Sequence, residues 1–420
     1  MKHLILGNGP AGVIAAETIR QRAPHDEIVM VGSENAPPYS RMAIPYLLMG
    51  NIEEPGTYLR KDPNHFEKLK IQQVHGKAIS IDPKAKKLFL EGQEGVPIAF
   101  DRLLIATGSV PVRPPVPGMD LPGVHPCWTL EDARAIAKLA KPGSRVLQMG
   151  AGFIGCIILE ALANRKVELT VVEMGDRMVP RMMTEVAGGM IKQWVQNKGV
   201  QVYTDTRVEE IVGSGSGLTV KLSNGKAIEV DLVISATGVR PNIEYLNSSG
   251  LEIERGVLVN ERMQSSDANI YAAGDVTESI DFSTGERIVN AIQPNAAEQA
   301  RIAAINMTGG DAQSLGALQI NVLDTLGLIS SSFGLWSGAA GGDHIEMVDS
   351  AGHKYLRLEF LEDVLIGATC VGTTEHIGVL RGLIQGKIAL GEWKKILMEE
   401  PTKAMEAYLA KGQAQSTWMN

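Results

Sequence analysis

The 420-residue sequence contains few cysteines and histidines, the residues from which proteins most often build zinc and iron–sulfur centres. Its three cysteines, Cys127, Cys156 and Cys370, are widely separated and form neither a CxxC pair nor another metal-ligand spacing. The eight histidines likewise form no HxxxH or HExxH arrangement. We therefore predict no metal site made of protein side chains.

The sequence also lacks an excess of basic residues and a long apolar run. Its formal net charge of −8 does not provide the positive surface that nucleic-acid binding requires, so we expect no nucleic-acid partner. It has no apolar stretch of 18 residues and no basic leader, which predicts no membrane span and a cytoplasmic location. The length predicts two or three domains.

Glycine, by contrast, is plentiful, and the first glycine motif follows directly after an apolar run at residues 4–6. Residues 7–12 read GNGPAG and precede a helical pattern. In a strand, glycine turn and helix of this kind, Gly7 permits the tight turn and Gly9 lets the backbone approach a pyrophosphate. Gly12 lets the helix pack against the strand. The helix N-terminus then faces the anion with free N–H groups.

A second strand pattern at residues 27–31 is followed by Gly32, Ser33 and Glu34. Glu34 lies 22 residues after Gly12, close to the roughly 20-residue offset at which a carboxylate binds the adenosine ribose. The alternative is an ordinary surface acid after a strand. The placement favours a ribose-binding carboxylate.

The same pattern returns later in the chain. Residues 145–149 are strand-like, residues 150–155 read GAGFIG, and a helix through Asn164 leads to a strand at residues 168–173. Two complete fingerprints in one chain are much stronger than one. They predict two dinucleotide-binding folds.

Glu173 ends the last of these strands, where the ribose 2′-hydroxyl of a nucleotide is expected. A carboxylate there repels a 2′-phosphate, so this half should prefer NADH to NADPH. Arg177, four residues further, weakens that preference slightly.

The remaining segments complete an α/β architecture. The strand ending in Ala-Thr-Gly at 106–108 is repeated at 236–238, and a third strand ends in Tyr-Ala-Ala-Gly-Asp at 271–275. The proline-rich residues 109–123 have the composition of a linker. Strand-like segments at 355–360 and 364–368 flank a Glu-Asp turn and predict an antiparallel hairpin.

We predict two Rossmann-like dinucleotide-binding domains, for FAD and NAD(P)H, and a C-terminal α+β domain. Their predicted limits are residues 1–112 for the first part of the FAD domain, 113–242 for the inserted NAD(H) domain, 243–315 for the second part of the FAD domain, and 316–420 for the C-terminal domain.

With these motifs in this order, the chain resembles the pyridine nucleotide-disulfide oxidoreductase superfamily of flavoproteins with two dinucleotide-binding domains. Within it the chain is most similar to NADH-dependent rubredoxin and ferredoxin reductases, NADH oxidases and the flavin part of nitrite reductases. The motifs that carry the likeness are GNGPAG, the first ATG, GAGFIG, the second ATG with the following VRPN, and YAAGD.

The resemblance implies that FAD binds at the first fingerprint and NADH at the second. The cofactor-binding residues that it and the motifs indicate are Gly7, Gly9, Pro10, Ala11, Gly12, Ser33, Glu34, Arg41, Ala78, Ala106, Thr107, Gly108, Gly150, Gly152, Phe153, Ile154, Gly155, Glu173, Gly238, Gly274, Asp275 and Ile292.

Several of these positions have particular expected roles. The resemblance implies that Asp275 forms a hydrogen bond with the ribityl chain and that Ala78 offers a backbone contact to adenine. It also implies that Ile292 brings a main-chain group to the flavin pyrimidine edge. Arg41 either faces a phosphate or flavin edge or is a solvated loop charge. Phe153 either covers the flavin or is a plain core residue.

The chain departs from the superfamily at two places. It has no CxxxxC beside the flavin, and Met42 stands where relatives with a single redox cysteine carry that residue. Methionine forms neither a sulfenate nor a mixed disulfide, so electrons should leave directly from the flavin. Ile157 stands where many relatives have a glutamate near the nicotinamide, which puts the usual docking geometry in question.

We therefore expect an FAD-dependent NAD(P)H oxidoreductase. No side chain is needed as acid or base for hydride transfer, because the chemistry belongs to the cofactors. The preferred acceptor is a small iron-sulfur protein or rubredoxin. The alternatives are dioxygen or a quinone as acceptor, and a slow NADH-binding flavoprotein sensor. The resemblance also implies a homodimer interface in the C-terminal domain.

Overall fold

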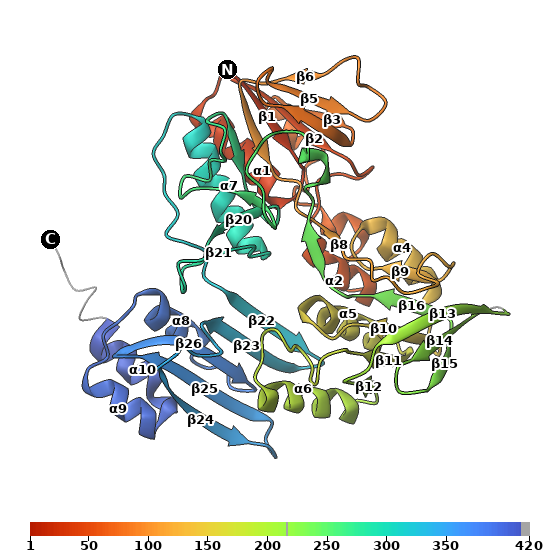
Figure 1. The fold of residues 1–420 in the computed structure, drawn as a ribbon, viewed down its shortest axis with the longest axis vertical. Coiled ribbons are helices and arrows are strands. Elements are labelled where there is room, and N and C mark those ends of the chain that lie inside the picture. Colours follow the sequence, from red (N-terminus) through yellow and green to blue (C-terminus); the bar gives the residue numbers. More distant parts are fainter. Residues whose placement is uncertain (216, 413–420) are drawn as a thin grey trace. The chain divides into compact units, whose positions relative to one another are not determined.

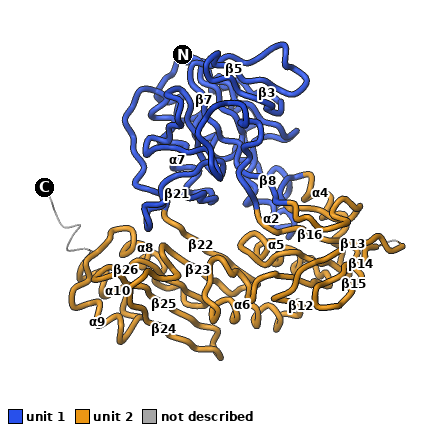
Figure 2. Tube along the Cα trace, in the orientation of Figure 1, with its two compact units in different colours: residues 1–112, 128–130, 239–317 blue, residues 113–127, 131–238, 318–420 orange. Residues whose placement is uncertain are grey.

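The computed structural model describes residues 1–215 and 217–412 of the chain (Figure 1). The chain divides into two compact units, coloured separately in Figure 2. The first unit contains residues 1–112, 128–130 and 239–317, and the second contains residues 113–127, 131–238 and 318–420. Each unit is described below by itself.

A five-stranded sheet forms the centre of the first unit, and all its strand pairs are parallel. Parallel strands are covered on both faces, which requires continuous apolar sequences such as that of the first strand. Leu4 and Ile5 accordingly have no exposed surface. The strand order is β19 (Ile270–Ala272), β7 (Arg102–Ile105), β1 (Lys2–Leu6), β2 (Glu27–Gly32), β3 (Ile71–His75).

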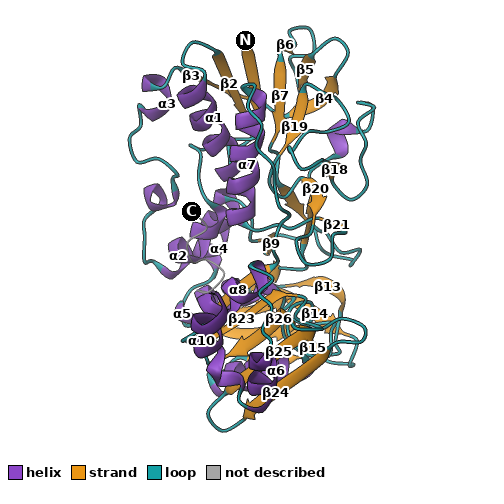
Figure 3. Ribbon diagram, turned by 90° about the vertical axis from the view of Figure 1, so that its left-hand side faces the viewer, coloured by secondary structure: helices purple, strands orange, loops and turns teal. Residues whose placement is uncertain are grey.

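Two long helices of this unit, α1 (Pro10–Arg22) and α7 (Gln293–Met307), pack side by side (Figure 3). Their small buried residues, among them Ala15 and Ala303, allow the close approach. An antiparallel sheet adds apolar side chains to the same core. It consists of β4 (Ala78–Asp82), β5 (Lys87–Leu90) and β6 (Ile98–Ala99).

Short elements complete the first unit. Strand β8 begins within the segment predicted as a linker and pairs antiparallel with β17, so the chain leaves and re-enters this unit along one two-stranded ribbon. The short elements are α2 (Ile44–Met49), α3 (His65–Lys68), β8 (Ser109–Pro111), β17 (Val239–Pro241), β18 (Val257–Leu258), β20 (Thr277–Ile280) and β21 (Arg287–Ile288).

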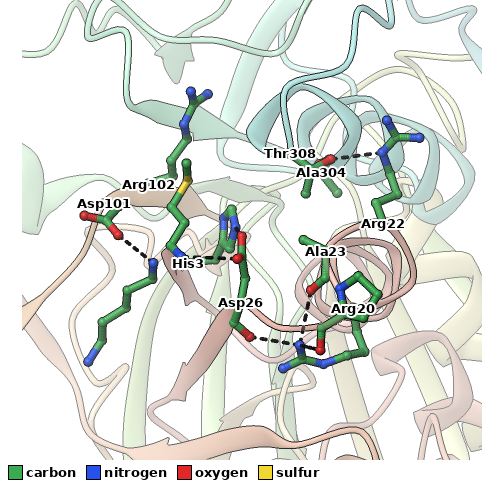
Figure 4. Close-up of polar contacts among 12 residues, drawn as sticks. His3, Arg20, Arg22, Ala23, Asp26, Asp101, Arg102, Ala304 and Thr308 are labelled. Atoms are coloured by element: carbon green, nitrogen blue, oxygen red, sulfur yellow. Dashed lines mark hydrogen bonds and ion pairs between the residues drawn. The ribbon is translucent and has the colours of Figure 1, made fainter.

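The start of β1 is held by polar contacts (Figure 4). The ammonium group of Met1 lies 3.1 Å from a carboxylate oxygen of Asp26, and Nε2 of His3 lies 2.9 Å from the other oxygen. The Lys2 N–H donates to Asp101 at 2.6 Å. Because His3 is fully buried, its pKa is lowered from the ordinary value, although the neighbouring Asp26 opposes this shift.

The second unit begins with another five-stranded sheet whose strand pairs are parallel. Its strand order is β12 (Gln201–Tyr203), β11 (Glu168–Val172), β10 (Arg145–Met149), β16 (Leu232–Ser235), β9 (Val124–Pro126). The accompanying elements are the helices α4 (Leu130–Leu139), α5 (Phe153–Asn164) and α6 (Glu185–Asn197) and the antiparallel strands β13 (Val208–Ser214), β14 (Gly217–Leu222) and β15 (Ala227–Val230).

The C-terminal part of this unit is an antiparallel sheet with helices. The predicted hairpin is confirmed, since Leu361 pairs with Val364 across the turn. The sheet order is β22 (Ile320–Thr325), β23 (Leu328–Gly334), β26 (Val364–Val371), β25 (Lys354–Leu361), β24 (Asp343–Asp349), and the helices are α8 (Ile377–Gln385), α9 (Glu392–Glu399) and α10 (Ala404–Ala407).

Hydrogen bonds join the two parts of the second unit. The Thr184 hydroxyl donates to the Tyr355 hydroxyl at 2.9 Å, and the Trp194 indole donates to the Leu326 carbonyl at 3.1 Å. The C-terminal sheet therefore packs against α5 and α6. The predicted α/β fold class is confirmed. None of the described helices is both long and apolar enough to cross a membrane.

Candidate dinucleotide-binding sites

The glycine turn of the first unit follows β1. Gly7 has φ +116°, and a Cβ at this position would collide with the Ala106 carbonyl. A Cβ at Gly12 would collide with the carbonyl of Gly7. Gly9 differs, because its φ of −74° suits any residue and, apart from its chain neighbours, no described residue lies within 4 Å of the place of its Cβ. Neither the backbone nor packing requires this glycine, so the open space fits a group from outside the chain.

The turn of the second unit has the same construction. Gly150 has φ +98°, and its Cβ would collide with the Ala236 carbonyl, while a Cβ at Gly155 would press on the Gly150 carbonyl. At Gly152, φ is −74° and, apart from its chain neighbours, no described residue lies within 4 Å of the Cβ position. Both turns therefore fit a dinucleotide pyrophosphate, which needs close approach to the backbone.

Three helices begin at or near these turns with uncapped N–H groups. Helices α1 and α5 follow the two glycine turns, and α7 begins close to the start of α1. Helices α1, α5 and α7 have no side-chain cap and no acidic residue in their first turn, as far as the structure describes them. Helix α6, by contrast, is capped by Thr184 and carries Glu185 in its first turn. Uncapped N–H groups and the helix dipole favour a bound anion.

The start of α7 lies close to the start of α1. A Cβ on Gly274 would lie 3.4 Å from the Cβ of Ala296 and 3.6 Å from that of Ala11. The Gly274 N–H donates to the Gln299 side chain at 2.8 Å, which fixes the end of β19 against α7. Ile292 is the N-cap of α7, and its main-chain contact with the flavin pyrimidine edge stays a prediction.

Asp275 follows directly, and it accepts a hydrogen bond of 2.7 Å from the Ser109 hydroxyl. Burial raises the pKa of Asp275, while the Ser109 hydrogen bond and the charge of Arg41 oppose the rise. The structure thus brings the residue after YAAG next to the residue after the first ATG. Beside it, the Thr107 hydroxyl donates to the Asn242 carbonyl at 3.0 Å, and Gly108 takes φ +65°.

Arg41 contacts protein groups on several sides. Its guanidinium donates to the Glu34 carboxylate at 2.5 Å and to the Trp128 carbonyl at 2.6 Å, and it stacks on the Tyr39 and Trp128 rings. The Tyr39 hydroxyl donates to the other oxygen of Glu34 at 2.5 Å. The Trp128 indole donates to the Ser109 carbonyl at 3.1 Å. A continuous chain of contacts thus runs from Glu34 to Asp275.

Sequence reasoning missed three members of this chain of contacts, Tyr39, Ser109 and Trp128. The sequence does contain a pattern that points to Ser109, because this residue follows the ATG turn directly. No sequence pattern points to Trp128, since the segments on both sides of residues 128–130 belong to the second unit. Three predicted roles stay predictions: Ser33 and Glu34 at the FAD pyrophosphate and ribose, Arg41 at a phosphate or the flavin edge, and Ala78 at adenine.

In the second unit, the Glu173 carboxylate is bonded to the glycine turn, while its role at the ribose stays a prediction. One carboxylate oxygen accepts from the Ala151 N–H at 2.6 Å and the other from the Gly175 N–H at 2.8 Å. The Arg177 guanidinium is already bonded within the protein, because it donates to both oxygens of Asp176 and to the Met183 carbonyl. It is therefore not a free cation for a 2′-phosphate.

Other predicted residues of the second unit lie around the same turn. Gly238, with φ +106°, lies two residues after Ala236, whose carbonyl packs on Gly150. Phe153 and Ile154 are the first residues of α5 and are half-buried, and Ile157 lies one turn further. Half-burial of Phe153 is compatible with either of its predicted roles.

All three cysteines lie in the second unit, and they are free and buried. Burial raises the pKa of Cys127, Cys156 and Cys370 to about 12 in each case. A thiol reacts as its thiolate, so such side chains are inert at neutral pH. Met42, in the first unit, is 46% exposed.

Comparison with known proteins agrees with this geometry. The family model described as pyridine nucleotide-disulphide oxidoreductase matches residues 1–300. Subunit epsilon of the NADH-dependent phenylglyoxylate dehydrogenase of Aromatoleum evansii is 31% identical over 86% of this chain and 86% of that protein. The NADH oxidase of Methanocaldococcus jannaschii is 35% identical over 74% of this chain and 71% of that protein.

Two further proteins extend the comparison. The ferredoxin–NAD(+) reductase component of the biphenyl dioxygenase system of Paraburkholderia xenovorans is 26% identical over 92% of this chain and 93% of that protein. The solved structure of an NAD-dependent persulfide reductase from A. fulgidus has a TM-score of 0.86 and 30% identity, covering 93% of this chain and 78% of that chain.

The chain therefore belongs to the pyridine nucleotide-disulphide oxidoreductase family. It is an FAD-dependent NAD(P)H oxidoreductase, and its cofactors are FAD and NAD(P)H.

Proposed function

We propose that the chain takes electrons from NADH onto FAD and passes them directly to a small one-electron carrier, an iron-sulfur protein or rubredoxin. The position of the cysteines carries this proposal. The unit with the first glycine turn has no cysteine, and the three cysteines of the other unit are buried with raised pKa values. No thiol is therefore available to relay electrons beside a flavin in the first unit.

The first unit supplies the groups for FAD, whose isoalloxazine ring accepts electrons in a pair and releases them singly. The open space at Gly9 and the N–H groups of α1 receive the pyrophosphate. Asp275, oriented by Ser109, binds a ribityl hydroxyl. The uncapped start of α7 stabilises negative charge at the pyrimidine edge.

The second unit supplies the groups for NADH. Gly152 and the start of α5 receive its pyrophosphate, and Glu173 accepts hydrogen bonds from its adenosine ribose. Because Arg177 is occupied by Asp176, the site favours NADH over NADPH. The protein orients the nicotinamide and excludes water, and no side chain needs to act as acid or base.

The identity of the electron acceptor is the more specific part of the proposal. Similarity to a ferredoxin–NAD(+) reductase supports an iron-sulfur partner. Similarity to an NADH oxidase supports a second candidate, in which dioxygen or a quinone is reduced directly. Similarity to a dehydrogenase subunit is compatible with this chain acting as a subunit of a larger complex, with the same electron transfer from NADH to flavin.

An acceptor comparison tests the proposal. Purified holoenzyme is mixed with NADH and, in separate assays, a [2Fe–2S] ferredoxin, a rubredoxin, a soluble quinone or dioxygen. We expect kcat/KM for at least one protein carrier to exceed that for dioxygen by about 100-fold. Faster reduction of dioxygen or quinone than of both carriers would establish the second candidate. Stable NADH binding without turnover on any acceptor would instead establish a sensor.

A further inference from the structure

The two parallel sheets allow a residue-by-residue comparison of the two nucleotide turns. In the first unit, Leu6 pairs with Val31, and the next residue of β2 is Gly32. In the second unit, Met149 pairs with Val172, and the next residue is Glu173. Gly32 therefore occupies the register position that the ribose carboxylate occupies in the other fold of the same chain.

The residue after the first glycine of each turn also differs between the two folds. Where the strand carries a glutamate the turn carries a small residue, and where the strand carries a glycine the turn carries a polar one. In the second unit it is Ala151, whose N–H donates to Glu173 at 2.6 Å. In the first unit it is Asn8. A Cβ on Gly32 would lie within 2.7 Å of the Nδ2, Cγ and Oδ1 atoms of Asn8. The Asn8 amide thus fills the space of the side chain that Gly32 lacks.

The Asn8 amide also has free hydrogen-bonding capacity. It is half-buried and makes no side-chain hydrogen bond to the described part of the chain. Glu34, two residues beyond Gly32, is already bonded by Tyr39 and Arg41. Of these two polar side chains, Asn8 is the one at the register position and without a protein partner.

We propose that Asn8 recognises the adenosine ribose of FAD in place of the missing carboxylate. Its Oδ1 accepts a hydrogen bond from one ribose hydroxyl, and its Nδ2 donates to the oxygen of the other. The proposal rests on FAD binding at the first turn and is independent of the electron acceptor. The chain therefore binds its two adenosine riboses differently, with a neutral amide from the turn in one fold and a carboxylate from the strand in the other.

The first test uses Asn8→Ala in the full-length protein. Flavin is removed, and rebinding is followed by the quenching of flavin fluorescence. We expect the Kd for FAD to rise about 10-fold, as for the loss of one or two hydrogen bonds. For an FAD analogue without the two adenosine ribose hydroxyls, the wild-type and Asn8→Ala proteins should bind equally. An unchanged Kd for FAD, or an equal loss for FAD and the analogue, would overturn the proposal.

The second test transfers the arrangement of the second fold into the first. Gly32→Glu alone should weaken FAD binding, because its Cβ meets the Asn8 amide. The double variant Asn8→Ala/Gly32→Glu reproduces the Ala151 and Glu173 pair and should bring the Kd within about 3-fold of wild type. Circular dichroism and NADH binding at the second fold control for folding. A double variant weaker than both single variants contradicts the proposal, whereas a wild-type chain that binds no FAD contradicts the proposed function instead.

Discussion

The Ser109 hydroxyl donates a hydrogen bond of 2.7 Å to the carboxylate of Asp275, although the two residues are 166 positions apart. Ser109 follows the end of β7, and Asp275 follows the neighbouring strand β19. Because parallel strands end at the same sheet edge, the residues after them meet there. This edge is where α1 and α7 also begin.

Asp275→Ala should weaken FAD binding by about 10- to 100-fold, because a charge-assisted hydrogen bond to the ribityl chain is lost. Ser109→Ala should have a smaller effect, since Ser109 acts by orienting Asp275. The ratio of FAD to protein after gel filtration and a fluorescence titration measure both. Glu286→Ala, which removes an exposed acid of the same unit, is the matched control. Full retention of FAD by Asp275→Ala would refute this assignment.

Nucleotide preference should depend on Glu173 and Asp176 together. Glu173→Gln removes the charge that repels a 2′-phosphate and keeps an oxygen for the Ala151 N–H. Asp176→Asn weakens the hold on Arg177. We expect the ratio of kcat/KM for NADH to that for NADPH to fall about 10-fold in Glu173→Gln and further in the double variant. A ratio that stays at the wild-type value would show that neither carboxylate sets the preference.

The cysteines should be dispensable for turnover. Each of Cys127→Ala, Cys156→Ala and Cys370→Ala should keep kcat within about twofold, because the thiols are buried, with pKa values of about 12. Iodoacetamide should leave the mass of the native protein unchanged at neutral pH and alkylate all three cysteines in urea. Loss of turnover in a variant that still holds FAD would reveal a thiol relay.

Stability should fall in mild acid because of His3. Burial lowers its pKa below the ordinary 6.5, so the unfolded chain binds the proton first as the pH falls. The contribution of neutral His3 is therefore complete above pH 6.5 and decreases below it, with a slope of at most about 1.4 kcal/mol per pH unit.

Urea unfolding at pH 7.5 and 5.5 measures this effect. His3→Gln should lose less stability between the two pH values than wild type, whereas His25→Gln, at an exposed position, should behave like wild type. Equal losses in all three proteins would exclude His3 as the cause.

The fold and much of the site could be predicted because their physical requirements are local. A glycine at position 7 is needed where a Cβ would collide with Ala106, and the same applies to Gly150 and Ala236. Such constraints leave a sequence pattern. The expected helix through Asn164 ends at that residue.

The remaining site residues depend on tertiary contacts that leave no local pattern. Trp128 joins the first unit from within a segment that belongs to the second. The exchange of roles between Asn8 and Gly32 becomes visible only when β1 and β2 are aligned by their pairing. The placement of Glu34 beside Arg41 needs the fold of the intervening loop.

The stoichiometry of flavin reduction tests the central claim most directly. Holoenzyme is titrated with NADH under anaerobic conditions while the flavin absorbance is recorded. Without a redox-active disulfide the protein stores two electrons, so one equivalent of NADH per FAD should complete the bleaching, and added ferredoxin or rubredoxin should restore the colour. A requirement for two equivalents would show that a second two-electron centre takes part, which would contradict direct transfer from the flavin.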